Sequence, residues 1–131
     1  MKTSQLKTIF AMLVMAAFIF TSCKKDNPSP KHPIAGNWVG KYGSGNETPS
    51  TFFKIQILDN GTLKIKNEEN VVTGNGTWEL NELNFTAVYS YEPGNHLNLA
   101  AKYSEAEATL SGSWGFGVAN PADGDFFLKK E

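Results

Sequence analysis

The sequence predicts an all-β domain, and three observations carry this prediction. Between residues 36 and 130, apolar and polar residues alternate with a period of two, the pattern of strands that bury one face. Turn residues divide this alternation into eight short segments, and the single cysteine leaves no disulfide to staple a less regular fold. Eight antiparallel strands joined by short hairpins can close into an up-and-down barrel without exposed edges. We therefore predict a small eight-stranded antiparallel up-and-down barrel. A β-sandwich is the alternative, because the same alternation fits both architectures.

The first four expected strands begin at Trp38 and end near Leu80. A strong turn signal, Asp59-Asn60-Gly61, separates the second from the third, since Asn-Gly tolerates the positive φ of a tight hairpin. Lysine, glutamine and threonine occupy the alternate positions and are expected to face solvent. The residues expected to face inward are Trp38, Tyr42, Phe53, Ile55, Ile57, Leu63, Ile65, Trp78 and Leu80.

The last four expected strands continue the alternation to Leu128. Glu92-Pro93-Gly94-Asn95 turns the chain between the fifth and the sixth. Ser104-Glu105-Ala106-Glu107 matches a helix capping box, so a single helical turn is expected before the seventh. The inward positions are Phe85, Ala87, Tyr89, Tyr91, Leu97, Leu99, Ala101, Tyr103, Ala108, Leu110, Gly112, Trp114, Phe126 and Leu128.

The N-terminus has a different pattern. Lys2 and Lys7 precede an unbroken apolar run over residues 9–20, which is shorter than the roughly 20 residues that a membrane-spanning helix needs. Phe20-Thr21-Ser22-Cys23 resembles the lipobox of a bacterial lipoprotein signal, with phenylalanine in place of the usual leucine. The resemblance implies that residues 1–22 are a signal peptide, that Cys23 is lipidated with fatty acids such as palmitate, and that the membrane is a partner through this anchor.

Residues 23–33 are expected to be a lipidated, flexible tether that precedes a domain of residues 34–131. Three prolines within residues 27–33 favour extended, polyproline-like backbone. Lys24-Lys25-Asp26 resembles the short signals that carry some lipoproteins to the surface of Gram-negative bacteria. The expected location is therefore the bacterial outer membrane, either on its periplasmic side or at the cell surface.

Composition and charge exclude some partners and cofactors. The formal net charge of −1 becomes −3 when Lys2 and Lys7 are removed, and every positive charge is a lysine. Because basic patches with arginine forks are the usual equipment for nucleic acids, no nucleic-acid partner is expected. Asp123-Gly-Asp125 offers two of the 6 to 8 oxygens that calcium takes, so we interpret it as a turn. No metal or other cofactor is expected.

A further resemblance concerns the start of the first strand. Gly36-Asn37-Trp38 resembles the Gly-x-Trp signature of the lipocalin and calycin group, and the chain is similar to small lipocalin-like bacterial lipoproteins. This resemblance implies an up-and-down barrel that carries small apolar ligands. It also implies that the tryptophan packs across the closed end of the barrel under an arginine of the last strand. Here the last strand offers Lys129 and Lys130 instead.

The inward register predicts a binding protein and not an enzyme. No carboxylate, histidine or lysine falls on the inward face, so a general acid or base is missing there. The polar atoms that remain are tyrosine hydroxyls and indole nitrogens, which suit a small apolar or amphipathic ligand. The candidate ligand-binding residues are Trp38, Tyr42, Trp78, Tyr89, Tyr103 and Trp114. Small inward residues, namely Gly74, Gly76, Ala87, Ala101, Ala108 and Gly112, are expected to leave room for the ligand.

The alternative function is a non-enzymatic interaction or inhibitor module of the cell envelope. It would act through its loops on a protein partner. Residues 115–124 are the candidate segment, because Phe116 and Val118 stand among glycines there. Apolar side chains on such a loop indicate either an interface or a lid over the mouth of the barrel.

Overall fold

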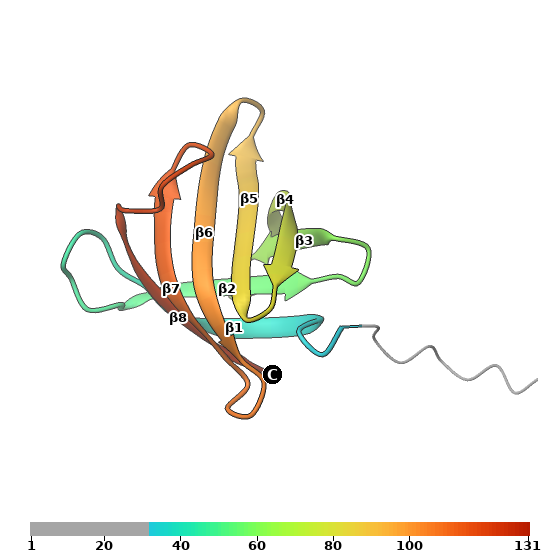
Figure 1. Ribbon diagram of the computed structural model, residues 1–131. Coiled ribbons are helices and arrows are strands. Elements are labelled where there is room, and N and C mark those ends of the chain that lie inside the picture. The colour runs from blue at the N-terminus through green and yellow to red at the C-terminus, as the bar shows by residue number, and fades with distance from the viewer. Residues whose placement is uncertain (1–31) are drawn as a thin grey trace, which may run out of the picture.

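The computed structural model describes residues 32–131. The predicted signal peptide, Cys23 and most of the tether lie outside the described residues. The described chain forms eight antiparallel strands (Figure 1). They are β1 (Gly36–Tyr42), β2 (Thr51–Ile57), β3 (Thr62–Lys66), β4 (Val72–Asn81), β5 (Asn84–Glu92), β6 (Asn95–Ser104), β7 (Thr109–Phe116) and β8 (Gly124–Lys130).

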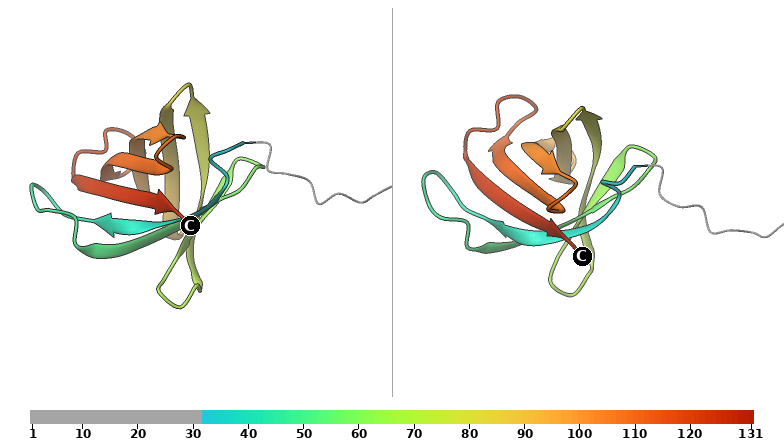
Figure 2. Two further views of the ribbon diagram at one scale, coloured as in Figure 1. Left: turned by 90° about the horizontal axis from the view of Figure 1, so that it is seen from below. Right: turned by 60° about the horizontal axis from the view of Figure 1, so that its bottom comes forward.

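The strands close into a barrel in sequence order. Each strand pairs with the next, and β1 also pairs with β8, with Val39 opposite both Lys54 and Lys129. The predicted up-and-down barrel is confirmed, and the sandwich alternative is wrong because one sheet closes on itself. Figure 2 shows the curved wall in two further views, with the β1–β2 loop projecting from one end and the described chain beginning at the other. Within residues 32–131, no helix is long and apolar enough to cross a membrane.

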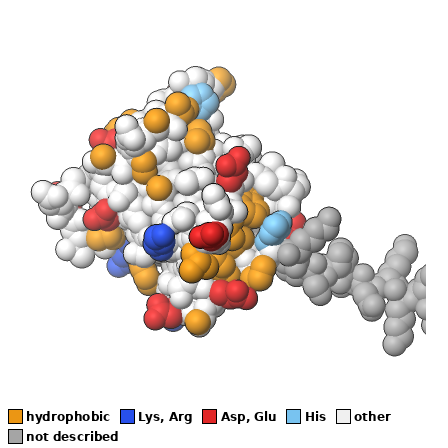
Figure 3. Space-filling model, in the orientation of Figure 1, with side chains coloured by type: hydrophobic (Ala, Val, Ile, Leu, Met, Phe, Trp, Pro, Cys, Tyr) orange, Lys and Arg blue, Asp and Glu red, His pale blue; other side chains and the backbone are white. Residues whose placement is uncertain are grey.

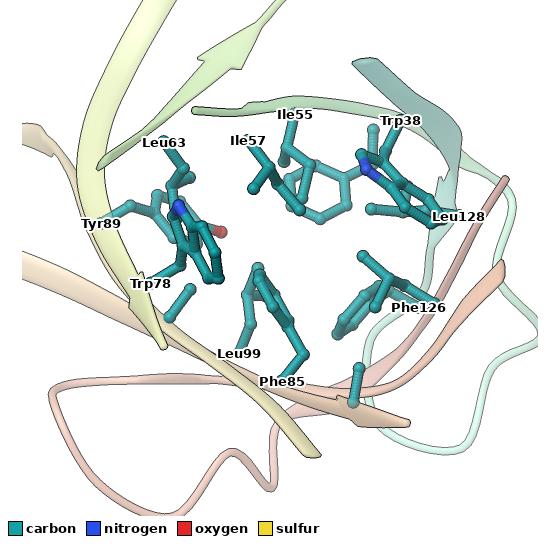
Figure 4. Close-up of a cluster of buried hydrophobic side chains, with 14 of the residues drawn as sticks. Trp38, Ile55, Ile57, Leu63, Trp78, Phe85, Tyr89, Leu99, Phe126 and Leu128 are labelled. Atoms are coloured by element: carbon teal, nitrogen blue, oxygen red, sulfur yellow. The ribbon is translucent and has the colours of Figure 1, made fainter. Parts of the chain in front are cut away.

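Alternation along the strands places the apolar side chains inside the barrel. Figure 4 shows inward-pointing side chains from most of the wall. Tyr42 and Leu80 are partly buried at the margins of this core, and Tyr91 is 49% exposed at its rim. The buried members of the core are Ile34, Trp38, Phe53, Ile55, Ile57, Leu63, Ile65, Trp78, Phe85, Ala87, Tyr89, Leu97, Leu99, Ala101, Tyr103, Leu110, Trp114, Phe126 and Leu128.

The turns follow the sequence signals, with one correction. Gly61 has a φ of 84°, and the Asn60 side chain accepts a hydrogen bond from the Thr62 N–H at 3.1 Å. Before β7 the chain makes a single hydrogen-bonded turn in which the Glu107 N–H donates to Ser104 Oγ at 3.3 Å, as a capping residue does. The prediction that Ala108 faces inward on β7 is wrong. Ala108 ends that turn with a φ of 53°, and β7 begins only at Thr109.

One end of the barrel is closed by the segment that leads into β1. Ile34 is fully buried there, and the Trp38 indole N–H donates to the Ile34 carbonyl at 2.8 Å. Trp38 also packs edge-on against Tyr103, with ring centroids 6.0 Å apart. The Lys130 ammonium donates to the Pro33 carbonyl. We call residues 32–35 the plug, because they cover the interior at this end.

The plug also explains the Gly-x-Trp motif in physical terms. Gly36 has a φ of 141°, and a Cβ there would lie 2.8 Å from the Lys130 side-chain stem. Lys130 therefore crosses Gly36 and holds the plug through a carbonyl, which an ammonium can do without the flat stacking of a guanidinium. The core and its plug both lie within residues 32–131, so this segment carries the closed barrel together with its buried core.

Candidate functional site

The end opposite the plug is open and forms an aromatic cup. Its volume is about 170 Å³. In Figure 1 the loops around it lie toward the top and left of the view, and Figure 3 shows several separate hydrophobic side chains in the upper part of the molecule. The residues that line the cup are Tyr42, Phe53, Tyr89, Tyr91, Leu97, Trp114 and Phe116.

Barrel topology brings these residues together from five strands. Tyr42 and Phe116 are the last residues of β1 and β7, and Leu97 lies near the start of β6. Leu97 pairs with Phe116 on one side and with Tyr89 on the other. Because neighbouring antiparallel strands run in opposite directions, strand ends and strand beginnings meet at the same rim.

Neighbouring rings in the cup stand nearly perpendicular to one another. Tyr42 contacts Phe53 at a centroid distance of 5.8 Å and an angle of 77°, and it contacts Trp114 at 5.7 Å and 83°. Trp114 in turn meets Phe116 at 5.3 Å and 78°. Edge-to-face contacts of this kind are each worth about 0.5–1.5 kcal/mol beyond the area they bury. These contacts fix the orientation of each ring relative to its neighbours around the cup.

The tyrosine hydroxyls are the polar groups that this cup offers. Burial raises the pKa of Tyr89 far above its ordinary value, and the neighbouring Tyr91 and Tyr42 add smaller contributions in the same direction. Burial likewise raises the pKa of Tyr91. Both phenols are therefore neutral at ordinary pH, and each has a hydroxyl that can donate or accept one hydrogen bond. A side-chain hydrogen bond between Tyr89 and Tyr91 adds to the rise in the pKa of Tyr89 and opposes the rise in the pKa of Tyr91.

The indole nitrogens, in contrast, are already committed to the protein. Trp38 donates to the Ile34 carbonyl, Trp78 to the Leu58 carbonyl and Trp114 to the Gly43 carbonyl, each at 2.8 Å. Each tryptophan thus ties a connecting segment to the barrel. An indole N–H used in this way does not orient a ligand, so the tyrosines are the better candidates for that role.

A second cavity of about 300 Å³ adjoins the cup. It shares Tyr42, Phe53 and Tyr91 with the cup and opens between β2 and the β3–β4 connection. Its remaining walls include polar and charged side chains, namely Lys66, Asn67, Glu68 and Thr73. We call this cavity the vestibule. Together, cup and vestibule present an apolar interior beside a polar entrance.

The structure separates the six candidate ligand-binding residues into two groups. Tyr42, Tyr89 and Trp114 line the cup. Trp38 and Tyr103 meet at the closed end, and Trp78 stacks on Phe85 there while the exposed His32 packs edge-on against its ring. Four residues that line the cup were not among the six candidates, namely Phe53, Tyr91, Leu97 and Phe116. Alternation reveals which face a residue occupies, and only its distance from the strand end reveals whether it reaches the cup.

Two of the small residues, Gly76 and Gly112, do not leave room for a ligand as expected. A Cβ at Gly76 would lie 2.1 Å from the Val88 carbonyl oxygen, and one at Gly112 would lie 2.0 Å from the Ala100 oxygen. Neither position has space for any side chain, because the backbone of the neighbouring strand occupies it. These glycines allow close approach of strands in a strongly curved wall. The prediction that they create a cavity is wrong.

The β7–β8 loop is fastened to the barrel on both sides. The Asn98 side chain, 4% exposed, donates to the Gly115 and Gly117 carbonyls at 3.3 and 3.1 Å. At the other side, the Asp123 carboxylate accepts a hydrogen bond from the Phe116 N–H at 2.8 Å. The two apolar candidates therefore lie at different sites. Phe116 lines the cup, whereas Val118 lines a groove on the outer face of β4–β6.

The described residues show no grouping of metal ligands. No set of three histidine, cysteine, aspartate or glutamate side chains in this part of the chain is placed to hold an ion. Asp125 accepts a hydrogen bond from Ser113 Oγ at 3.0 Å, so it serves the strand pairing of β7 and β8. His96 is exposed in β6. The buried core described above consists of aliphatic and aromatic side chains.

Comparison of the chain with protein-family models, with curated proteins and with solved structures finds no significant match. The closed barrel of eight antiparallel strands fits a lipocalin-like fold. The barrel and its aromatic cup are therefore the observations that bear on function.

Proposed function

We propose that this chain is a lipid-anchored binding protein of the cell envelope, which holds a small apolar or amphipathic molecule at the open end of its barrel. The observation that carries the proposal is the cup, in which six aromatic rings and a leucine surround about 170 Å³ beneath an open rim. Apolar walls with a few convergent polar groups are the usual composition of a small-molecule site.

The size of the cup limits what enters it. An apolar cavity of about 150 Å³ accommodates a single benzene, whereas drug-sized ligands occupy about 300–1,000 Å³. The cup therefore takes one ring or one short hydrocarbon segment. The rest of the molecule extends into the vestibule, where Lys66 and Glu68 provide charged partners. This division favours an amphipathic ligand over a wholly apolar one.

The proposed anchor and the cup belong to opposite ends of the domain. The described chain enters through the plug, and residues 24–31 between Cys23 and the plug span at most about 30 Å when fully extended. An anchor at Cys23 therefore leaves the cup free to receive a ligand from the surrounding medium or from a partner. The role is one of binding, without a chemical step.

Two exposed phenylalanines give the experiment its matched control. Phe116 is 64% exposed at the cup, and Phe127 is 46% exposed on the outer face of β8. We propose titrating residues 32–131 with the apolar fluorophore N-phenyl-1-naphthylamine. We expect Phe116→Ala to weaken saturable binding several-fold and Phe127→Ala to leave it unchanged. Absence of saturable binding, or equal effects of the two variants, would contradict the proposed site.

Native mass spectrometry of the mature protein, isolated without detergent, identifies the natural ligand. A bound mass of a few hundred daltons that is released on denaturation is the expected result. The alternative function, an interaction module acting through Val118 and its outer groove, predicts a different outcome. In that case Val118→Ala abolishes capture of a protein partner, and Phe116→Ala has no effect on it.

A further inference from the structure

The outer wall of the barrel divides into two halves of different charge. Strands β8, β1, β2 and β3 present an outward face that is rich in lysine, with apolar side chains between the lysines. We call this surface the lysine face. It consists of Val39, Lys41, Phe52, Lys54, Lys64, Lys66, Phe127 and Lys129.

Strand pairing makes this face continuous. Val39 lies opposite Lys54 on one side and Lys129 on the other, and Lys54 lies opposite Lys66. In the adjacent row, Lys41 lies between Phe52 and Phe127. Lys54 in this row is only 8% exposed and is neutralised by Glu131, so the net positive charge of the row comes from Lys66 and Lys129.

The concentration of charge runs against the balance of the domain. Residues 32–131 contain seven lysines and twelve carboxylate side chains, and five of the seven lysines are on this face. Glu131 pairs with Lys54 at 2.9 Å, and Asp125 lies at the margin of the face. The outward positions of β4–β7 are mainly threonine, serine and asparagine. In Figure 3, which presents β5, β6 and β7 in front, lysine atoms are sparse.

Lys66 lies directly opposite Lys54, and the Glu131 carboxylate that pairs with Lys54 offsets the repulsion between the two lysines. The exposed Phe127 adds an apolar group in the midst of this charge. Basic residues with interspersed aromatics are the composition of protein surfaces that lie on anionic membranes.

We propose that the lysine face docks on an anionic lipid surface. Lysine ammonium groups are flexible point charges that suit a fluid layer of phosphates, whereas specific phosphate sites favour the arginine fork, which this chain lacks. Phe127 supplies a hydrophobic contact at the level of the headgroups. Phe52 and Lys66 also line the vestibule, so the proposal is tested at Lys41, Phe127 and Lys129, which line neither the cup nor the vestibule.

The chain that precedes the structure agrees with this orientation. β1 lies at the centre of the lysine face and begins at Gly36, directly after the plug. Residues 24–31 allow at most about 30 Å between Cys23 and the plug. If Cys23 carries the predicted lipid, the anchor keeps the lysine face within reach of the bilayer. The face then adds a second, electrostatic attachment to the first.

Vesicle sedimentation with residues 32–131 tests the proposal without the anchor. At low ionic strength, we expect binding to phosphatidylcholine vesicles that contain phosphatidylglycerol and little binding to phosphatidylcholine alone. Lys41→Glu and Lys129→Glu should each weaken binding by about fivefold or more, since each basic residue near an anionic surface contributes about that factor. Lys102→Glu is the matched control: it makes the same charge change at an exposed position of β6 and should leave binding unchanged.

The two phenylalanines separate this proposal from the proposed function. Phe127→Ala should weaken vesicle binding and spare fluorophore binding, whereas Phe116→Ala should do the reverse. Equal binding to both kinds of vesicle would overturn the proposal. An effect of Lys102→Glu as large as that of Lys41→Glu would overturn it as well, because net charge and not the lysine face would then determine binding.

Discussion

At the closed end of the barrel Ile34 and Trp38 are fully buried, whereas at the open end Tyr91 and Phe116 are 49% and 64% exposed. Both ends are built from aromatic residues, and at both ends a tryptophan N–H binds a backbone carbonyl at 2.8 Å. The difference lies in the plug, which covers one end and has no counterpart among the described residues at the other. Aromatic composition alone therefore does not distinguish core from binding site.

Removing the Trp38 side chain, which contacts the plug, should reveal the difference between the two ends most clearly. Trp38→Ala should lower the free energy of unfolding by about 4 kcal/mol, because it deletes a fully buried indole and leaves a carbonyl without its donor. Urea denaturation followed by circular dichroism measures the change. Phe127→Ala, at an exposed position, is the control and should cost much less. A loss below about 1 kcal/mol for Trp38→Ala would mean that the plug does not stabilise the closed end.

Gly112→Ala, in the wall between the two ends, should cost about 2 kcal/mol. Its Cβ would meet the backbone of β6, which is unable to move without disturbing the β5–β6 and β6–β7 pairing. Ser111→Ala is the matched control, because it changes the neighbouring exposed residue of the same strand. If Gly112→Ala is tolerated as well as Ser111→Ala in thermal unfolding, the wall is less tightly curved than this contact requires.

Alternation and turn residues were sufficient to predict the eight strands, their closure and nearly all of the inward positions. The site was predicted only in part, because position along a strand depends on barrel geometry that a period of two does not encode. Tyr42 and Trp38 occupy the same face of β1, yet one lines the cup and the other contacts the plug. The close strand contacts at Gly76 and Gly112 could not be predicted either, because a glycine in a sequence can mark either an empty space or a close approach of two strands.

The buried phenol of the cup should make stability depend on alkaline pH. Since burial raises the pKa of Tyr89 above its ordinary value of 10.0, the unfolded chain loses this proton at a pH where the folded chain keeps it. Stability from this source is fully present below pH 10 and declines by about 1.4 kcal/mol per pH unit above it. Tyr89→Phe should remove this component, as measured by urea denaturation across that range. Identical pH profiles for the two proteins would show that Tyr89 titrates normally.

The smallest effect on stability is expected at the rim of the cup. Phe116→Ala should change the free energy of unfolding by no more than about 1 kcal/mol, because most of this side chain is already in solvent and mainly its edge-on contact with Trp114 is lost. The same substitution should weaken fluorophore binding several-fold. Trp38→Ala should show the opposite pattern under conditions where it remains folded, since its side chain does not line the cup. If Phe116→Ala instead destabilises the barrel as much as Trp38→Ala does, the rim is part of the core, and its side chains serve stability and not ligand binding.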